Sequence, residues 1–453
     1  MTDSKDIIDI TFTRIKSNRI DRIDKIIHNS VMMDETITAS IKEVEDTEEV
    51  KEIKEEEPSF DDMKCLSNNF ELLRGIMEYG FRNPSRIQKL VIDDIYDKYD
   101  IIAQSQSGTG KTGAFSIGAL ASINKAQLYP QVLILANTRE LATQIHYVIS
   151  NLSKYMNLNI CLCVGGTDVT NTNKHERIYG HVSTAHILIG TPGRIIDYIT
   201  RKAFNILKIK LFIMDEADTL LKNDFVEQIQ SIYTSLSRKA QVCVFSATYD
   251  EETLELTKTI TNENRKTILM ERDKLSIDLI QQYKIDVQRE YNKFDTLADL
   301  YKKLQIGQCI IFVNTINNVE RLSRRMIDNG FVVSKIHAQL SSFDRNKILH
   351  EFRIGLTRVL ISTDILSRGI DIEQIGIVIN YDMPRTSSQY LHRIGRSGRF
   401  GKKGVAINFI TDDEQFIIQS LNEEFNVSIE DMPEPSYVNE YLTGQGGHLK
   451  LNK

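Results

Sequence analysis

The residues best placed to do chemistry lie in one short loop. It runs from Ala103 to Thr112, reads Ala-Gln-Ser-Gln-Ser-Gly-Thr-Gly-Lys-Thr, and separates an apolar run from a predicted helix over Gly113 to Leu120. Glycines let successive backbone N–H groups turn inward, and a helix N-terminus adds its positive dipole end, so the pattern is typical of a phosphate cradle. In such a loop Lys111 faces the β/γ-phosphates and the Thr112 hydroxyl can bind Mg²⁺. Taken alone, the loop could also be a chance Gly-Thr-Gly-Lys turn.

A second group of candidates follows the apolar run Leu211 to Met214. Asp215 and Glu216 come next, and ligands bind at the carboxyl ends of strands in α/β folds. Asp215 is suited to hold Mg²⁺ through water, and Glu216 to position the water that attacks a γ-phosphate. Alone, these acids could instead cap the next helix. Together with the loop they supply both halves of a Mg-nucleotide site, which favours the chemical interpretation.

Asp215-Glu216-Ala217-Asp218 and the 103–112 loop together resemble the DEAD-box ATP-dependent RNA helicases. Other motifs of that family follow in order, and the resemblance extends from about Phe60 to Pro433. It implies two tandem RecA-like P-loop domains, each an α/β fold with a parallel sheet flanked by helices. It also implies ATP and Mg²⁺ as cofactors and RNA as partner.

The resemblance implies a complete nucleotide site. Residues 80–88 look like the adenine-recognition motif, in which Phe81 can stack on the base and Gln88 can pair with its edge. Residues 368–371 place Asp371 at the ribose. The implied nucleotide-binding residues are Phe81, Arg86, Gln88, Ser105, Gln106, Ser107, Gly108, Thr109, Gly110, Lys111, Thr112 and Asp371. Thr112 and Asp215 are the implied Mg²⁺ positions, reached through water.

Residues 392–399 resemble the family's last motif, far along the chain from the loop. Arg396 and Arg399 would act from the second domain as arginine fingers, and they join Lys111, Asp215 and Glu216 as implied catalytic residues. Ser246, Thr248 and His392 are implied to couple nucleotide state to domain closure. A basic surface turn is the alternative interpretation of the arginines, but it does not explain their repeat at Arg393, Arg396 and Arg399.

The implied RNA contacts are backbone amides, hydroxyls and isolated arginines, which suit phosphates and sugars rather than base edges. Binding should therefore be indifferent to sequence and sensitive to the 2′-hydroxyl. Gly-Gly and Thr-Pro-Gly segments can also be plain turns. The implied RNA-binding residues are Arg139, Gly166, Thr191, Gly193, Asn314, Thr315 and Thr363.

Five positions depart from the family pattern. Ser105 stands where the loop usually begins with glycine, and Asn137 where proline is usual. In the second domain Ala338 and Gln339 stand where glycine and aspartate are usual, and Ser342 where glutamine is usual, although Arg345 is retained. These last three departures bear on RNA contacts of the second domain.

Segments such as 60–63, 73–81, 293–297, 378–382 and 404–408 resemble the translation initiation factor 4A branch of the family. The resemblance implies an RNA-dependent ATPase and helicase that locally unwinds short duplexes in translation initiation. Two alternatives are an ATP-gated RNA clamp of the nuclear exon-junction type and an rRNA-processing helicase. A protein scaffold that assists domain closure, a monomeric state and a cytoplasmic location are expected, with a nuclear location as the alternative.

The elements that must position these residues alternate along the chain. Continuous apolar runs predict buried parallel strands at 101–103, 132–136, 160–164, 187–189, 211–214 and 242–245, then at 309–313, 332–336, 359–361, 375–379 and 404–410. The predicted organisation is an acidic, disordered extension at 1–57, an ATP-binding domain at 58–272, a second domain at 273–442 and a flexible tail at 443–453.

Bulk composition limits the other possibilities. The net charge is −6, and residues 1–57 hold sixteen Asp/Glu against nine Lys/Arg, so the remainder carries a net charge of +1 and RNA binding must depend on local groups. No apolar run reaches the length of a membrane span, and the acidic N-terminus argues against a secretion signal. Five scattered cysteines suggest a reducing compartment and are interpreted as small buried apolar residues.

Overall fold

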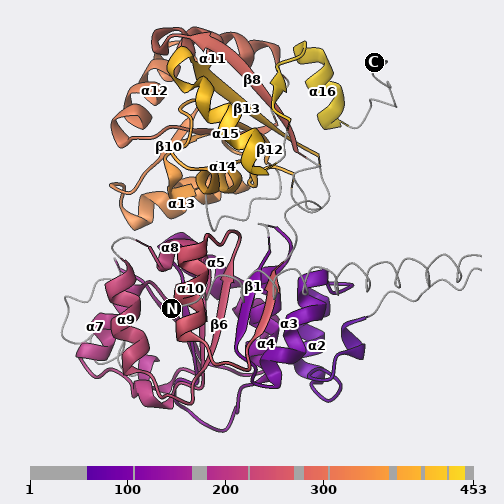
Figure 1. Cartoon of the computed structure of the whole chain (residues 1–453), viewed down its shortest axis with the longest axis vertical. Coiled ribbons are helices and arrows are strands. Elements are labelled where there is room, and N and C mark those ends of the chain that lie inside the picture. The colour runs from indigo at the N-terminus through magenta and orange to yellow at the C-terminus, as the bar shows by residue number, and fades with distance from the viewer. Residues whose placement is uncertain are drawn as a thin grey trace, which may run out of the picture. The chain divides into compact units, whose positions relative to one another are not determined.

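The computed structural model describes residues 59–105, 108–165, 181–222, 225–269, 280–304, 307–366, 375–398, 403–425 and 428–443. Two seven-stranded parallel sheets, each flanked by helices, account for these residues (Figure 1). We call residues 59–269 lobe 1 and residues 280–443 lobe 2. The predicted extension, the predicted boundary at 272/273 and all but the first residue of the predicted tail lie outside the described residues, so these limits stay predictions.

Within the described part of the chain, no helix is both long enough and apolar enough to span a lipid bilayer.

The sheet of lobe 1 has the order β3-β4-β2-β5-β6-β1-β7. Each predicted run of this lobe is a strand whose ends agree within two residues. The short edge strand β7 was not predicted, because its sequence Lys-Thr-Ile-Leu is mostly exposed. The strands are β1 (Ile101–Gln104), β2 (Val132–Leu135), β3 (Ile160–Cys163), β4 (Ile187–Gly190), β5 (Leu211–Met214), β6 (Gln241–Ser246) and β7 (Lys266–Leu269).

Alternate residues of these strands feed two cores, one on each face of the sheet. Ile101 and Ala103 pack on one face, and Ile102 between them packs on the other. The first face is covered by α2 (Phe70–Tyr79), α3 (Arg86–Tyr96), α4 (Lys111–Ala121) and α5 (Arg139–Leu152), and the second by α7 (Pro192–Thr200), α8 (Ala217–Leu220), α9 (Val226–Ser235) and α10 (Glu251–Ile260). Two 3-10 turns, η1 (Phe60–Asp62) and η2 (Ile206–Lys208), complete the lobe.

Lobe 2 repeats this plan with the order β10-β11-β9-β12-β13-β8-β14. Its strands are β8 (Ile280–Gln288), β9 (Gln308–Phe312), β10 (Ser334–Ile336), β11 (Val359–Ser362), β12 (Ile375–Asn380), β13 (Gly404–Thr411) and β14 (Glu430–Asp431). One face carries α11 (Lys293–Lys303), α12 (Ile316–Asp328) and α16 (Pro435–Thr443), and the other α13 (Ser342–Arg353), α14 (Ser387–Ile394) and α15 (Gln415–Phe425). The 3-10 turns are η6 (Glu290–Asn292), η7 (Asp364–Leu366) and η8 (Asp412–Glu414).

The predicted fold class, two α/β domains with parallel sheets flanked by helices, is confirmed. The topology also explains why the polar motifs meet. In a parallel sheet all carboxyl ends lie at one edge, and helices α4, α5, α7 and α8 begin directly after strands β1, β2, β4 and β5. The chemical residues of lobe 1 therefore share one edge of its sheet.

Candidate nucleotide and RNA site

The phosphate loop closes around Lys111, the first residue of α4. Gly108 (φ 84°) and Gly110 (φ 98°) have left-handed backbones, which residues with a Cβ rarely adopt, so glycine is required at both positions. Lys111 Nζ donates to the Ser105 carbonyl across the loop. The buried Ser105 hydroxyl forms a hydrogen bond with the Thr109 hydroxyl. The loop therefore accommodates serine in place of glycine by giving its hydroxyl a partner.

The segment predicted to recognise adenine, residues 80–88, packs directly on this loop. Gln88 Oε1 accepts from the Ser85 amide (2.8 Å), and Gln88 Nε2 donates to the Gly110 carbonyl (3.3 Å). A Cβ at Gly113 would lie 2.7 Å from Gln88 Nε2 and 2.9 Å from Phe81 Cε2, so a larger residue there would displace one of these side chains. Each polar end of the Gln88 amide keeps bonding capacity for a base edge.

The other nucleotide candidates occupy different environments. Phe81 also contacts two further aromatic rings, with its centroid 6.3 Å from that of Phe60 and 4.9 Å from that of Tyr79. Arg86 is exposed at the start of α3. Gln106, Ser107 and Asp371 lie outside the described residues, so their predicted roles are not tested by the geometry.

The acidic residues after β5 are buried beside the loop. Burial raises the pKa of Asp215 to about 7; the neighbouring Glu216 acts in the same direction, and Lys111 opposes it. Burial also lowers the pKa of Lys111, against the pull of Asp215 and Glu216. Both shifts reflect charges removed from water, which a bound ion and phosphates of opposite sign would compensate. Asp215 and Thr112 offer a carboxylate and a hydroxyl, the oxygen donors that Mg²⁺ prefers, so this pair fits the predicted ion.

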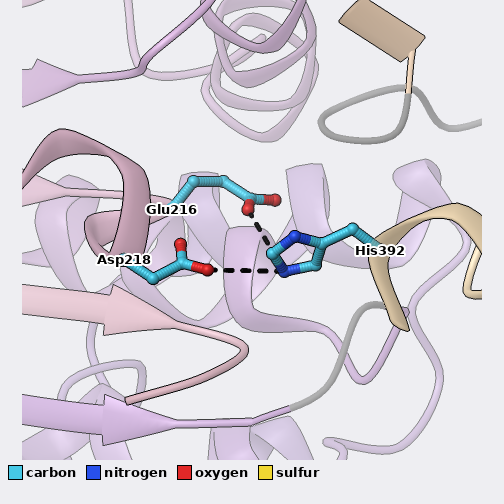
Figure 2. A group of neighbouring side chains, drawn as sticks. All are labelled: Glu216, Asp218 and His392. Carbon is cyan, nitrogen blue, oxygen red and sulfur yellow. Dashed lines mark ion pairs between the residues drawn. The ribbon is translucent and has the colours of Figure 1, made fainter. Parts of the chain in front are cut away.

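Glu216 is held in a strained conformation. Its φ of 57° is left-handed although it carries a full side chain, and its amide donates to Asp215 Oδ1 (3.0 Å). Such backbone strain is typical of functional positions, because the surrounding structure must maintain it. The turn directs the Glu216 side chain away from the strand and toward His392 (Figure 2).

His392, in α14 of lobe 2, lies beside the carboxylates of Glu216 and Asp218. Its Nε2 lies 3.8 Å from Glu216 Oε2 and 3.6 Å from Asp218 Oδ2 (Figure 2). Asp218 Oδ2 also accepts from Thr248 Oγ1 (2.8 Å) and Ser388 Oγ (3.2 Å), and these two hydroxyls lie 3.0 Å apart. One carboxylate thus links the segment after β5, the segment after β6 and a helix of lobe 2.

The predicted coupling residues therefore lie together. Ser246 Oγ accepts from the Asp218 amide (3.3 Å) and donates to the Thr248 carbonyl (2.8 Å), which fixes the turn that presents Thr248. Ser388, the partner from lobe 2, was not predicted, because nothing in its local sequence distinguishes it from an ordinary residue of a helix's first turn.

Arg396 is nearly inaccessible to solvent, with 2% of its surface exposed. Its Nε donates to the His392 carbonyl (3.1 Å), and its positive charge contributes to the lowered pKa of Lys111. The second effect requires Arg396 to lie near the phosphate loop, although the two residues belong to different lobes. Arg399 lies outside the described residues.

Several predicted RNA contacts are at helix N-termini that follow strands. Thr191 precedes α7, Thr315 precedes α12, and Arg139 opens α5 after Thr138, whose hydroxyl accepts the Leu141 amide (3.2 Å). Helix N-termini present unpaired N–H groups and a positive dipole end, which are suited to phosphates. Gly193 is exposed in the first turn of α7, Thr363 is half-buried after β11, and Gly166 lies outside the described residues.

Asn314 is held by an internal network rather than presented to solvent. Its Nδ2 donates to the Met383 carbonyl (2.8 Å), and its Oδ1 accepts from Arg393 Nη2 (2.8 Å). Arg393 is fully buried and also binds both Asp364 oxygens, at 2.5 Å and 3.0 Å. Arg393 therefore organises the segments after β9, β11 and β12, and the predicted role of Asn314 toward RNA remains a prediction.

A buried ion pair between the lobes was not predicted from sequence. Arg345 Nη1 of α13 lies 2.6 Å from Glu140 Oε1 of α5, and the two side chains are 7% and 6% exposed. Glu140 follows Arg139 directly, so the pair ties α13 to a helix N-terminus predicted to contact RNA. Ser342, where the pattern departs, is the first residue of the same helix α13.

Comparison with known proteins gives consistent matches in both lobes. The DEAD/DEAH box helicase family matches residues 85–257, and the helicase conserved C-terminal domain matches residues 292–401. The ATP-dependent RNA helicase FAL1 of Eremothecium gossypii is 46% identical over 83% of this chain and 93% of that protein. The ATP-dependent RNA helicase eIF4A of the same organism is also 46% identical, over 83% of this chain and 92% of that protein.

A solved structure resembles the whole described fold. S. cerevisiae Dbp5 bound to RNA and ADP BeF3 is 34% identical and covers 82% of this chain and 97% of its own, with a TM-score of 0.77. The overall fold thus recurs in a protein whose structure contains RNA and ADP BeF3.

Proposed function

Since this chain belongs to the DEAD-box helicases, as an ATP-dependent RNA helicase of the eIF4A type, we propose that ATP and RNA drive its two lobes together and that hydrolysis releases them. The observation that carries this proposal is the contact of His392 and Ser388 with Asp218. Asp218 belongs to the same acidic segment as Asp215 and Glu216, and these two residues of lobe 2 contact it directly. Closure and chemistry are therefore coupled through one buried carboxylate.

We propose roles for the site residues from the positions of those that the structure describes and from the family resemblance. Lys111 exchanges the Ser105 carbonyl for phosphate oxygens, and Gln88 and Phe81 select adenine. Glu216 orients the attacking water, and Arg396 brings positive charge from lobe 2, joined by Arg399. Asp215 and Thr112 would hold Mg²⁺, which neutralises phosphate charge when bound. Asp371 is assigned to the ribose.

We propose that RNA is bound through its backbone. Arg139, Thr191, Gly193, Thr315 and Thr363 offer hydroxyls, guanidinium groups and helix N-termini, and no set of them resembles a base-reading array. Gly166 and Asn314 complete the proposed contacts. Binding then depends on ribose and phosphate, and a bend imposed on one strand unpairs a short duplex locally.

We place the activity in translation initiation, on the strength of the relatives named eIF4A. This role implies a monomer in the cytoplasm and a protein scaffold, because any partner that binds both lobes in the closed state raises its population. The similar FAL1 match keeps a nuclear role, as an RNA clamp or in rRNA processing, as the second candidate.

Glu216→Gln tests the proposal. ATP hydrolysis with saturating single-stranded RNA should fall by about 10²-fold or more, while ATP and RNA binding persist and the complex dissociates slowly. Glu227→Gln, an exposed acid in the first turn of α9, is the matched control and should behave as the parent. Parent-like hydrolysis by Glu216→Gln, or no stimulation of the parent by RNA, would contradict the proposal.

A further inference from the structure

Two thiols lie side by side on an edge strand of lobe 1. Cys161 and Cys163 are two residues apart in β3, so their side chains leave the same face of the sheet. Cys163 Sγ–H donates to Cys161 Sγ, and the sulfurs are 3.9 Å apart. Cys161 is half-buried, whereas Cys163 and the other three cysteines are buried. The pair is thus distinct from an ordinary buried cysteine.

The hydrogen bond makes the two thiols unequal. Donation from Cys163 lowers the pKa of Cys161, and the same bond, together with burial, raises the pKa of Cys163. The more accessible sulfur is therefore the one more readily present as a thiolate, the form that reacts with oxidants. The other sulfur remains a thiol held within reach of it.

We propose that Cys161 and Cys163 form a peroxide-sensitive dithiol that oxidises to an intrachain disulfide and thereby weakens RNA binding. Cys161 thiolate attacks one peroxide oxygen, the O–O bond breaks, and the products are Cys161 sulfenic acid and hydroxide. Cys163 sulfur then attacks Cys161 sulfur, and the sulfenic OH group leaves with the Cys163 proton as water. The hydroxide of the first step takes up the proton that Cys161 released to solvent when it became a thiolate, and this gives the second water. In sum, two thiols are oxidised and one peroxide is reduced to two waters.

Closing this bond must deform β3. The sulfurs have to approach from 3.9 Å to about 2.05 Å, and the bridge has a fixed preferred dihedral angle that a regular strand does not provide. In the described sheet β3 is at the edge and pairs with β4 alone. An edge strand can shift on its free side without breaking a second ladder, so deformation is feasible here.

The carboxyl end of β3 contacts residues assigned to RNA. The Cys163 carbonyl accepts the Thr191 amide (3.2 Å), at the cap of α7. Two residues farther on, Gly165 packs against Arg139: a Cβ there would lie 2.7 Å from Arg139 Nη2. The phosphate loop follows β1, which is separated from β3 by β4, β2, β5 and β6 in the sheet order, so ATP binding should be unaffected. The effect on RNA rests on the proposed function.

The test uses the full chain, reduced or treated with hydrogen peroxide. Peptide mapping should find a 161–163 disulfide, and fluorescence anisotropy should show RNA affinity reduced about tenfold, reversed by dithiothreitol, with ATP affinity unchanged. Cys161→Ser, and Cys161→Ala as a second variant, should bind RNA as the reduced parent does. Their RNA affinity should not change on treatment with hydrogen peroxide.

Absence of the 161–163 bond after treatment would overturn the inference, and so would a bond that leaves RNA affinity unchanged. Failure of the reduced parent to bind RNA would contradict the proposed function instead. In that case the peptide map still decides whether the dithiol exists.

Discussion

At the scale of single residues, Gly113 determines how closely the base-recognition motif approaches the phosphate loop. The first turn of α4 leaves no room for a side chain between itself, Gln88 and Phe81. Both of those side chains are assigned to adenine, so their positions depend on a residue that need not touch the ligand.

Gly113→Ala should therefore weaken ATP binding. The added methyl must displace Gln88 or Phe81, and overpacking of this kind costs about 1–3 kcal/mol, which corresponds to roughly a tenfold or greater rise in Kd. Titration with a fluorescent ATP analogue measures this Kd. Gly307→Ala is the control, since a Cβ there meets no atom within 4 Å. Equal affinity in the two variants would show that the contact does not position the motif.

Residues assigned to the ligand were easier to find in the sequence than residues that hold them in place. Lys111, Asp215 and Glu216 were found because loop spacing and a strand-end acid pair are local signals. The role of Arg393 was not, because its partners Asn314, Asp364 and Asn380 lie on separate segments that only the folded sheet brings together. Ser388 and the Glu140–Arg345 ion pair were not predicted from the sequence for the same reason.

At the scale of secondary-structure elements, helix N-termini at the carboxyl edge of the sheet are the main candidates for phosphate binding. Three of them follow strands β2, β4 and β9, and each is preceded by a threonine. The threonine at α5 and α12 accepts a backbone amide, which fixes the first turn and the direction of its remaining N–H groups.

Thr138→Ala should affect stability and RNA binding together. Loss of the cap at α5 costs about 1 kcal/mol and loosens the turn that carries Arg139. Asn69→Ala removes the corresponding cap of α2, where Asn69 Oδ1 accepts the Leu72 amide, and no RNA contact is assigned to that helix. Thermal unfolding and RNA anisotropy should distinguish the two variants. Both should lose a similar amount of Tm, but only Thr138→Ala should bind RNA more weakly. An RNA affinity equal in both would argue against helix-terminal binding.

The elements themselves were largely predictable. Runs such as Leu211 to Met214 are continuously apolar because a parallel strand is buried on both faces, and they matched strands closely. β8 was not identified as a strand, because its sequence Ile-Gln-Gln-Tyr-Lys-Ile-Asp-Val-Gln mixes polar and apolar residues. One of those polar residues, Gln282, is buried and accepts from Tyr390 Oη (2.8 Å), a tertiary contact without a sequence signal.

For the complete chain, closure of the two lobes is the proposed basis of activity. The Glu140–Arg345 pair is a buried contact that spans the lobes without touching the nucleotide residues. Removing one member leaves the other charge buried without this partner, which is costlier than removing both.

A double-mutant cycle tests this contact. Glu140→Ala and Arg345→Ala should each reduce RNA-stimulated ATP hydrolysis, the double variant should be no worse than either, and the coupling energy should be about 1–3 kcal/mol. Basal hydrolysis without RNA supplies the control, because it should change little. Additive losses would mean that the two residues act independently.

In the proposed mechanism lobe 1 binds the triphosphate and lobe 2 completes the site with Arg396. The most direct measurement is kcat for ATP hydrolysis at saturating RNA in Arg396→Ala, with ATP Kd measured in parallel and exposed Arg324→Ala as control. We expect kcat to fall by about 10³-fold or more, with Kd nearly unchanged. A kcat equal to that of the parent, in a protein that binds ATP and RNA normally, would contradict it.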